Sequence, residues 1–352
     1  MPHLRTVEDY GLAFRLMEPI GLEGYIDGGA GRGVTLERNT AAWDHIEVRP
    51  RVLAGPAQVN LATTVIGTTD AVPFMVAPMG FQRYVKSDGG VVIPRAAAAA
   101  GVRYCHSTFA SSGFSDLAGI AGLRWWFQLY ALKDWGLNRT MVQLAVEAGA
   151  EAVILTVDLA ALGVRERDVH TGFSLRGNAH VPCVEEAGAT DPRLAPTWAS
   201  LDHDLSWSSL AELVGFSPVP VIVKGILRPD DAASAIDHGA SAVVVSNHGG
   251  RQLDTSVPTA VVLADIVDRV DGRGSVIVDS GLRSGLDVAK ALALGADSTM
   301  IGRPIMWGLG VAGEEGVGQV LRLFQEDVER SIILMGARST SELNREFVTQ
   351  RH

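Results

Sequence analysis

Cysteine is scarce in this chain, since only Cys105 and Cys183 occur among 352 residues. Two cysteines cannot supply the disulfide framework of a small secreted protein. Neither lies in a motif that activates a thiol, so we expect both to be buried and unreactive. The chain also lacks the Cys/His spacing of zinc sites and the G-x-S-x-G elbow of serine hydrolases. These absences predict a cytoplasmic protein that binds no metal.

Positive charge is also in short supply. The chain has 30 Lys and Arg against 40 Asp and Glu, a net charge of -10. A surface of that sign repels phosphate backbones and anionic lipid, so we expect neither a nucleic-acid nor a membrane partner. No stretch of about 18 apolar residues is present to span a bilayer, and the first residues lack the apolar core of a signal peptide.

Short apolar runs recur along the chain, and each is followed by a polar or glycine-marked turn. Most are apolar throughout, which is typical of parallel strands that are covered on both faces. Segments with helical spacing lie between them, at 90–101, 138–150, 228–240 and 284–296. Eight alternating units predict a (β/α)8 TIM barrel, with an open doubly wound sheet as the alternative. The predicted strands are 73–77, 102–106, 125–130, 152–158, 220–224, 241–246, 275–279 and 298–302.

Three regions fall outside the repeat. Residues 1–72 predict an N-terminal helical extension with an irregular glycine-rich stretch, GYIDGGAGRG. Residues 159–207 predict a long, mostly irregular loop after strand 4, and loops of that length are typically lids or binding loops. Residues 317–336 predict a final amphipathic helix. No linker composition divides the chain, so residues 1–352 are expected to form a single domain.

The stretch VVVSNHGGRQLD (243–254) carries the strongest chemical signal. His248 and Arg251 directly follow a buried strand, and Gly249 and Gly250 between them permit positive φ. Active sites of these barrels lie at the carboxyl ends of the strands. Histidine is a general base near neutral pH, and arginine binds a carboxylate through two parallel hydrogen bonds. Each residue alone is equally compatible with a structural role, but the whole string at a strand end favours a catalytic one.

Other charged residues follow neighbouring strands. Lys224 ends the fifth strand and predicts a fixed positive charge in the barrel mouth, with a snorkelling lysine or buried ion pair as the alternative. Asp158 ends the fourth strand, where it either orients His248 or caps a loop. Arg165 lies seven residues further on, and its spacing does not distinguish a substrate-binding arginine from a solvated one.

The seventh and eighth units predict a phosphate site. VDSGLRSG (278–285) and IGRP (301–304) place small residues before helix-like segments, and Arg283 and Arg303 supply positive charge. Phosphate sites of these barrels are built there from backbone N–H groups and a helix N-terminus. The stretch GGAGRG (28–33) is a weaker phosphate signal because no strand precedes it. The residues thus predict an enzyme that acts on a small carboxylate with a phosphorylated cofactor.

Several stretches resemble the family of FMN-dependent 2-hydroxy acid oxidases and dehydrogenases, which includes glycolate oxidase, lactate oxidase and mandelate dehydrogenase. The resemblance runs from about Tyr25 to the last helix, and its most specific part is SNHGGRQLD (246–254). The other matching stretches are FQLY (127–130), LTVDLAALGVRERD (155–168), VKG (223–225), VDSGLRSGLDVAKALALGA (278–296) and IGRP.

The resemblance implies roles for individual residues. His248 is the expected base at the substrate α-carbon, and Asp158 stabilises its protonated form. The residues that the resemblance assigns to substrate binding are Tyr25, Tyr130, Arg165, Arg251 and Phe109. Those that it assigns to FMN are Ala77, Pro78, Met79, Ser107, Gln128, Thr156, Lys224, Ser246, Asp279, Gly281, Arg283, Gly302 and Arg303.

Two departures from the family bear on the substrate and on the electron acceptor. Phe109 replaces a pocket tryptophan of glycolate oxidase, and Gly80 stands where many of the oxidases carry alanine. The resemblance implies oxidation of a small, aryl or medium-chain (mandelate-like) 2-hydroxy acid, with electrons passed to O2 or another acceptor, by a homotetramer. Two alternatives are a flavin-independent barrel isomerase or lyase acting on a phosphorylated metabolite, and a non-catalytic flavin-binding protein.

Overall fold

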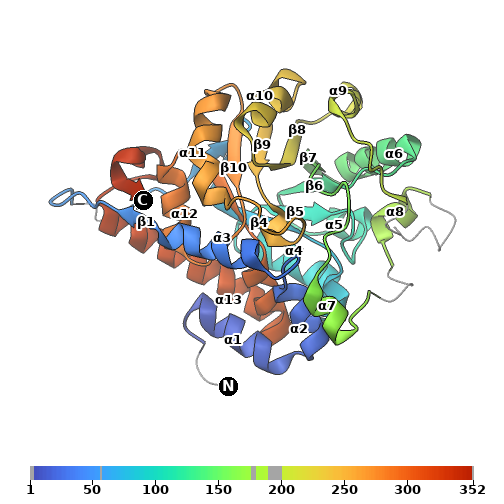
Figure 1. Ribbon diagram of the computed structural model, residues 1–352, viewed down its shortest axis with the longest axis horizontal. Coiled ribbons are helices and arrows are strands. Elements are labelled where there is room, and N and C mark those ends of the chain that lie inside the picture. The colour runs from blue at the N-terminus through green and yellow to red at the C-terminus, as the bar shows by residue number, and fades with distance from the viewer. Residues whose placement is uncertain (1–3, 56–57, 176–179, 189–199, 351–352) are drawn as a thin grey trace.

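Eight parallel strands close into a barrel in the computed structural model, which describes residues 4–55, 58–175, 180–188 and 200–350 (Figure 1). The strands follow one another around the barrel in chain order, and the last, β11, pairs with the first, β4. All eight predicted strands and the TIM barrel are confirmed, and the open sheet is wrong. The strands are β4 (Phe74–Met79), β5 (Tyr104–Ser107), β6 (Trp125–Leu129), β7 (Ala150–Thr156), β8 (Val221–Ile226), β9 (Ala242–Val245), β10 (Ser275–Val278) and β11 (Ser298–Ile301).

Successive residues of each strand pack on opposite sides of the barrel wall. On β4, Met75 and Ala77 belong to the core inside the barrel, whereas Phe74 and Val76 pack outward against the helices. Strands that are covered on both faces in this way need apolar residues at every position, which is why the runs show no alternation. Cys105 lies in the interior core, and burial raises the pKa of its thiol, as expected for an unreactive cysteine.

Helices surround the barrel (Figure 1). The segments predicted as helices at 90–101, 138–150, 228–240 and 284–296 are confirmed as α4 (Gly89–Ala99), α6 (Trp135–Glu147), α10 (Pro229–Asp237) and α12 (Gly285–Ala293). The final helix, predicted at 317–336, is longer than expected: α13 runs from Arg303 to Met335, with a break at Ala312 and Gly313. Its first part is almost uniformly apolar because it is buried, so it lacks the amphipathic pattern that marks a surface helix. The helices are α4 (Gly89–Ala99), α5 (Phe114–Ala118), α6 (Trp135–Glu147), α9 (Trp207–Phe216), α10 (Pro229–Asp237), α11 (Thr259–Val270), α12 (Gly285–Ala293) and α13 (Arg303–Met335).

The N-terminal extension is helical as predicted, but it also holds three short strands. Its helices are α1 (Val7–Met17), α2 (Ile20–Asp27) and α3 (Val34–Asp44), so the stretch expected to be irregular, 24–33, is helical as far as Asp27. β1 (Ile46–Val48) pairs with β12 (Val348–Gln350) near the other end of the chain. β2 (Thr63–Val65) and β3 (Thr68–Asp70) form a hairpin whose Val65 packs into the core inside the barrel. Three-residue strands carry too little pattern to be recognised in a sequence.

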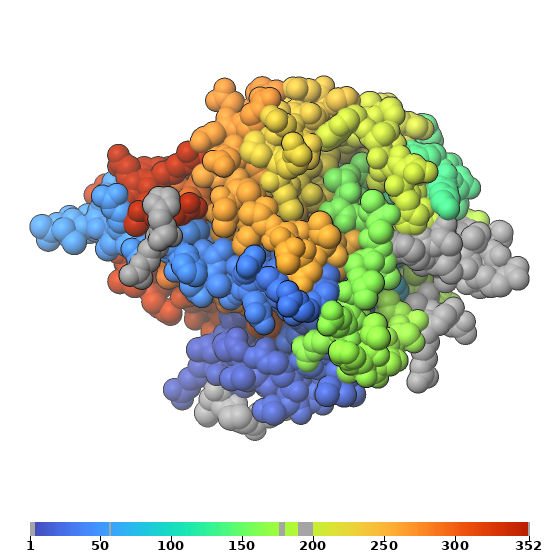
Figure 2. Space-filling model, viewed as in Figure 1, coloured from blue at the N-terminus to red at the C-terminus, as the bar shows by residue number. Residues whose placement is uncertain are grey.

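The loop after β7, predicted at 159–207, contains two short helices in its described part, α7 (Glu166–Thr171) and α8 (Pro182–Glu186). Residues 176–179 and 189–199 of this loop lie outside the described residues. α7 packs against α2, and Figure 2 shows the green α7 segment beside the dark blue N-terminal helices. α8 is anchored by Cys183, which is buried against His106 with 3.3 Å between Sγ and Nε2. Burial raises the pKa of this thiol too, as expected for an unreactive cysteine.

Two of the expected absences can be examined over the described residues. No helix there is both long and apolar enough to cross a bilayer. Within the same ranges, no group of three or more His, Cys, Asp or Glu side chains is arranged to hold a metal ion.

Candidate active site

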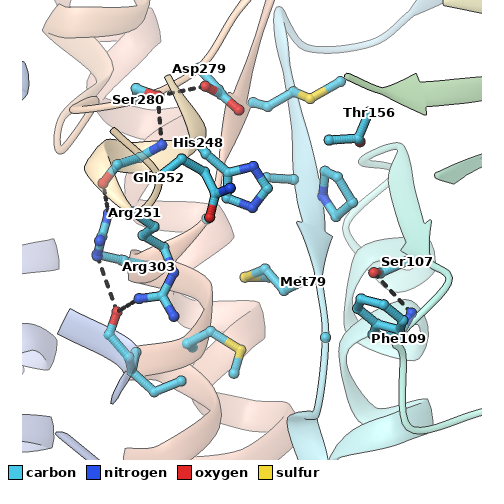
Figure 3. Close-up of a pocket in the computed structure, with 18 of the residues that line it drawn as sticks. Met79, Ser107, Phe109, Thr156, His248, Arg251, Gln252, Asp279, Ser280 and Arg303 are labelled. Atoms are coloured by element: carbon cyan, nitrogen blue, oxygen red, sulfur yellow. Dashed lines mark hydrogen bonds between the residues drawn. The ribbon is translucent and has the colours of Figure 1, made fainter. Parts of the chain in front are cut away.

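A cavity of about 500 Å³ opens at the carboxyl ends of the barrel strands. Cavities of this size accommodate a cofactor or a small ligand. Figure 3 shows His248, Arg251 and Arg303 on one side, and Ser107, Phe109 and Thr156 on the other, with Met79 between them. All predicted site residues line the cavity except Asp158, Gln128 and Ser246, which lie behind those that do.

His248 projects into the cavity from the turn that follows β9. Its backbone has a φ of 58°, which is unusual for a residue other than glycine, and Gly249 and Gly250 also have positive φ, as predicted. The backbone N–H of His248 donates to Ser246 Oγ at 3.0 Å. This turn directs the imidazole ring toward Asp158, at the start of the loop after β7.

The two ring nitrogens of His248 have different partners. Nδ1 lies 2.9 Å from Asp158 Oδ1, and Nε2 lies 3.2 Å from the Tyr130 hydroxyl. A carboxylate only accepts hydrogen bonds, so the proton of the neutral ring is on Nδ1 and Nε2 keeps its lone pair. Burial acts to raise the pKa of Asp158, but the protonated form of His248, the hydrogen bond from His248 and the charge of Lys224 outweigh burial, so the pKa is lowered. The result is a histidine that can accept a proton at Nε2 and whose protonated form is stabilised by an ionised carboxylate.

Two arginines flank Tyr25 in the same cavity. The guanidinium carbons of Arg165 and Arg251 lie 5.2 and 5.1 Å from the centre of the Tyr25 ring. Arg165 is paired with Asp168 at 2.9 Å, whereas the partners of Arg251 among the described residues are backbone carbonyls. Burial lowers the pKa of Arg251, and the nearby charge of Arg165 lowers it further. Two neighbouring cations with one acid between them favour an anionic ligand, and arginine matches a carboxylate in geometry.

A second pair of cations lies toward the start of α13. Arg303 donates to the carbonyls of Ile26, Gly28 and Gly249 at 2.9 to 3.1 Å, and Arg283 donates to its neighbour Leu282 at 2.9 Å. Neither forms an ion pair with a carboxylate anywhere in the described residues. Burial lowers the pKa of both guanidinium groups, and for Arg303 the charges of Arg251 and Arg283 add to the effect. Burying cations without a counterion is costly, so this end of the cavity favours a ligand with a strongly negative group such as phosphate.

Polar groups at the ends of the other strands are joined in two short networks. Ser107 Oγ donates to Gln128 Oε1, and Gln128 Nε2 donates to Thr156 Oγ1, both at 2.9 Å. On the other side Lys224 Nζ lies 3.0 Å from Asp279 and 2.8 Å from Ser246 Oγ. Burial acts to lower the pKa of Lys224, but Asp279 and Asp158 outweigh it, so the pKa is raised and the lysine is charged. The cavity therefore offers a fixed cation beside neutral donors and acceptors.

An aromatic wall borders the histidine. The Phe109 ring is stacked on Tyr130 at 4.8 Å between ring centres and on Phe81 at 5.6 Å. A Cβ at residue 80 would lie 2.9 Å from the Cβ of Phe109, so Gly80 makes room for this ring. The two departures noted in the sequence, Phe109 and Gly80, are thus in direct contact and shape one wall. Leu162, half exposed, lines the cavity as well.

Sequence reasoning missed several residues that hold the site together. Gln252 donates from Nε2 to the carbonyls of Asp158 and Ala161 at 3.1 and 2.9 Å, which ties the loop after β7 to the His248 turn. Asp254 accepts from the backbone N–H groups of Arg32 and Thr35 at 3.1 and 2.8 Å. Both lie inside the string that drew attention to His248, so the string itself was the available signal. The role of Asp254 depends on a partner segment more than 200 residues away and has no local signature.

The glycine-rich stretch 28–33 carries a weak phosphate signal in the sequence, and the structure gives it another role. Ala30 donates its N–H to the Gly250 carbonyl at 2.8 Å, and Gly31 donates to Val164 at 2.7 Å. Only the carbonyl of Gly28 reaches the charged groups of the cavity, through Arg251 and Arg303. This stretch therefore joins the His248 turn to the loop after β7.

Comparisons with known proteins agree with this site. A family model described as FMN-dependent dehydrogenase matches residues 17–350. The chain is 39% identical over 337 residues to an L-lactate oxidase of Nostoc sp., with 92% of each chain covered. It is 38% identical over 346 residues to a 4-hydroxymandelate oxidase of Amycolatopsis orientalis, with 97% of each covered. A crystal structure of mandelate oxidase with benzoyl-formic acid superposes with a TM-score of 0.89 at 36% identity, covering 99% of this chain and 98% of that one.

Proposed function

The chain belongs to the FMN-dependent dehydrogenase family, and we propose that it uses FMN to oxidise an aryl 2-hydroxy acid of the mandelate type to the 2-oxo acid. The observation that carries this proposal is the arrangement of His248 in the cavity. Its Nδ1 is held by Asp158, which leaves Nε2 as the ring nitrogen that can accept a proton, and Arg251 and Arg165 lie in the same cavity. A base beside two carboxylate-binding cations matches the chemistry of a 2-hydroxy acid.

The residues present fit FMN. The buried Arg283 and Arg303 have no carboxylate partner in the part of the chain that is described, and they would hold the phosphate together with backbone at Gly281 and Gly302. Ser107, Gln128, Thr156, Ser246 and the backbone at 77–79 would hold the ring system and the ribityl chain, with Asp279 at the ribityl end. Lys224 would supply positive charge beside the ring, where negative charge accumulates on reduction. When bound, FMN would take up the two electrons and one of the two protons that the oxidation releases, and His248 would take up the other proton.

The substrate carboxylate would be bound by Arg251 and Arg165. Tyr130, whose hydroxyl lies 3.2 Å from His248 Nε2, would donate a hydrogen bond to a substrate oxygen. His248 would accept a proton from the substrate on its Nε2. Asp158 would then stabilise the resulting imidazolium through the hydrogen bond to Nδ1. Tyr25 lies beside both guanidinium groups and is attracted to each as an aromatic ring is to a cation.

An aromatic substituent on the substrate is favoured by the wall that Phe109, Tyr130 and Phe81 form. Aromatic rings attract one another in stacked and edge-on arrangements by about 0.5–1.5 kcal/mol beyond the area they bury. Phe109 offers no hydrogen-bond donor, so the wall selects for a ring without requiring a polar group on it. The names of two similar proteins, 4-hydroxymandelate oxidase and mandelate oxidase, support the same choice.

The experiment that tests this proposal is an anaerobic visible spectrum of the purified protein, titrated with mandelate, 4-hydroxymandelate, lactate and glycolate. We expect flavin bands that bleach with the aryl acids at lower concentrations than with the aliphatic ones. Readmitting air then measures how fast O2 restores the colour, which tests whether O2 is the electron acceptor. A protein that binds FMN but is bleached by none of these acids would overturn the proposed substrate class.

The flavin-independent isomerase or lyase has no support, because the family is FMN-dependent. A protein that stays colourless after incubation with FMN would restore that alternative. A non-catalytic flavin protein is disfavoured by the complete set of base, carboxylate and arginines.

We further propose that the chain is one catalytic domain and acts as a cytoplasmic homo-oligomer, a tetramer if it follows the family resemblance. Exposed apolar side chains on α1 and at the start of α2 support an interface. They are Leu12, Leu16, Met17 and Ile20. Light scattering coupled to gel filtration measures the mass directly, and a monomer of about 37 kDa would contradict the proposed assembly.

A further inference from the structure

The C-terminal end of α2 contacts both halves of the proposed site. The carbonyl of Ile26 accepts hydrogen bonds from Arg303 at 3.1 Å and from Arg251 at 3.4 Å. The carbonyl of Gly28 accepts from the same two arginines, at 2.9 and 3.1 Å. Residues 25–28, which we call the 25–28 turn, therefore hold the proposed phosphate-binding arginine and the proposed carboxylate-binding arginine at once.

Asp27 lies between these two carbonyls, and its side chain points elsewhere. Its Oδ1 accepts a hydrogen bond from Trp307 Nε1 at 2.7 Å, and its Oδ2 lies 3.3 Å from Arg15. Trp307 is buried near the start of α13, four residues after Arg303. A buried indole N–H needs an acceptor, and a charged acceptor forms the stronger hydrogen bond. This contact therefore fixes the 25–28 turn to the helix that carries Arg303.

The Trp307 ring also contacts the second proposed phosphate-binding arginine. The guanidinium carbon of Arg283 lies 5.4 Å from the ring centre, and that of Arg15 lies 5.6 Å from it. A cation near an aromatic face is attracted by about 0.5–2 kcal/mol, depending on how dry the site is. The negative charge of Asp27 acts to raise the pKa of both Arg283 and Arg303, against the effect of their burial. Trp307 thus contacts Arg283 directly, and Asp27 acts on Arg303 through the carbonyls of Ile26 and Gly28 on either side of it.

We propose that Asp27 and Trp307 are positioning residues that couple the FMN phosphate site to the substrate carboxylate site through the 25–28 turn. The inference rests on the proposed function, because it takes Arg283 and Arg303 as the phosphate ligands and Arg251 as the carboxylate ligand. Neither Asp27 nor Trp307 lines the cavity, so they act through the arginines and do not touch the substrate. Loosening the turn weakens the hold on both anionic groups and leaves the neutral parts of the site unchanged.

The first test uses the full chain stripped of FMN, with quenching of flavin fluorescence as the readout. Trp307→Phe removes the indole N–H and keeps an aromatic ring, and Asp27→Ala removes the acceptor. We expect the Kd for FMN to rise about tenfold in both variants, the worth of one hydrogen bond to a charged group. The Kd for riboflavin, which lacks the phosphate, is expected to stay within about twofold of the wild-type value. A merely structural defect would weaken both ligands alike.

The second test measures the substrate side in the holoenzyme at saturating FMN. Benzoylformate and its methyl ester are titrated while changes in the flavin absorbance are followed. We expect the Kd for benzoylformate to rise several-fold in Trp307→Phe and in Asp27→Ala, and the Kd for the ester, which has no carboxylate, to stay unchanged. Asp27→Asn keeps an uncharged acceptor for Trp307, so it is expected to raise both Kd values by less than Asp27→Ala does.

Glu23→Gln provides a matched control, because Glu23 is a buried acid of the same helix that pairs with Arg167 of α7 and not with the site. Glu23→Gln should leave the ratio of the Kd for FMN to the Kd for riboflavin unchanged. If Asp27→Ala does not fold, Trp307→Phe decides the matter. The inference is wrong if the folded variants keep the wild-type ratio of the Kd for FMN to the Kd for riboflavin. It is also wrong if Asp27→Asn binds FMN as weakly as Asp27→Ala does. A wild-type protein that binds no FMN would instead contradict the proposed function.

Discussion

His248 has an unusual backbone conformation, with a positive φ, and a ring that is held by a carboxylate as in many catalytic histidines. A positive φ at a residue other than glycine costs on the order of 1–3 kcal/mol and persists only where the surroundings hold it. Here the Ser246 hydroxyl accepts from the His248 N–H and Asp158 holds the ring. The unusual backbone conformation thus places the His248 side chain in the cavity.

Replacing His248 by Asn should remove the base and leave FMN binding intact. We expect the rate of flavin reduction by the substrate to fall by about 10²- to 10⁴-fold, the usual contribution of general-base catalysis. Anaerobic stopped-flow spectroscopy measures this rate. His238→Asn, at an exposed histidine on the outside of the barrel, serves as the control. Reduction of His248→Asn at near the wild-type rate would show that another group is the base.

Glu151 gives a pH dependence whose sign follows from its partners. Burial acts to raise its pKa, but Arg124 and Arg103 outweigh this and the pKa is lowered from the ordinary 4.5. A carboxylate with a lowered pKa in the folded state adds stability above its unfolded pKa, and this is lost as the pH falls through the folded pKa.

We therefore expect the free energy of unfolding to decrease between about pH 5 and about pH 3, and to decrease less in Glu151→Gln. Urea denaturation at each pH measures it. Equal slopes in the two proteins would contradict the assignment.

At the scale of elements, the loop after β7 is clamped at its first half. Gln252 bonds to the carbonyls of Asp158 and Ala161, and Gly31 bonds to Val164. A Cβ at residue 163 would lie 2.4 Å from the carbonyl oxygens of Arg251 and Gln252, so only glycine permits this close approach. The clamp places Arg165 in the cavity.

Gly163→Ala should displace the segment that carries Arg165. We expect the KM for the 2-hydroxy acid to rise about tenfold or more, with a smaller change in kcat, because one of the two carboxylate ligands moves. Steady-state kinetics separates the two constants. Gly172→Asn in the same loop is the control, since its left-handed backbone tolerates Asn and no other group lies within 4 Å of the added Cβ. Similar kinetic changes in both variants would argue against the clamp.

The hairpin β2–β3 closes the opposite end of the barrel and is held by a buried charge cluster. Arg103, whose side chain is fully buried, bonds to Asp70 at 2.7 Å and Glu151 at 2.5 Å, and lies over the Trp126 ring. Breaking a buried ion pair by removing one partner costs about 3–5 kcal/mol.

We therefore expect Arg103→Ala to lower the free energy of unfolding by about that amount, as measured by chemical denaturation. Arg124 contacts the same two acids but is 39% exposed, so Arg124→Ala should cost about 1 kcal/mol or less. Equal losses in the two variants would mean that burial of the pair does not set its strength.

At the scale of the whole molecule, an acidic protein concentrates positive charge in one place. The net charge is -10, yet Arg165, Lys224, Arg251, Arg283 and Arg303 all line the same cavity. A cationic cleft with low-dielectric walls focuses the field and attracts anions, while the rest of the surface repels them. The charge of the whole chain therefore describes what the surface excludes and not what the site binds.

Three of these cations, Arg251, Arg283 and Arg303, have no carboxylate partner among the described residues, which predicts that the protein without FMN is markedly less stable than the holoenzyme. A ligand at 100 times its Kd adds about 2.7 kcal/mol to the free energy of unfolding. We expect a corresponding rise in Tm on adding FMN, and inorganic phosphate at millimolar concentration should reproduce part of it. Differential scanning fluorimetry measures both effects. A Tm that is insensitive to FMN and to phosphate would show that the cluster needs no anion.

Much of this molecule was determined by the sequence itself. The eight strands and the helices between them follow from local patterns: uniformly apolar runs of strand length, helical periodicity and glycine-marked ends. His248 and Arg251 were found because a barrel places every strand end at one mouth, so position along the chain predicts position in space. Histidine and arginine have distinctive chemistry, so their position at a strand end was enough to predict that they lie in the active site.

The tertiary structure alone decided how those residues are held. Three contacts join segments that lie far apart in the chain: the carbonyls of the 25–28 turn with the arginines, Asp254 with residues 32 and 35, and Val65 with the core inside the barrel. Every residue has a carbonyl, so a carbonyl that binds an arginine leaves no mark in the sequence. The early start of α13 was hidden for a related reason, because a fully buried helix loses the polar face that identifies it. Local pattern determined the parts and their order, and the long-range contacts decided which of them support the site.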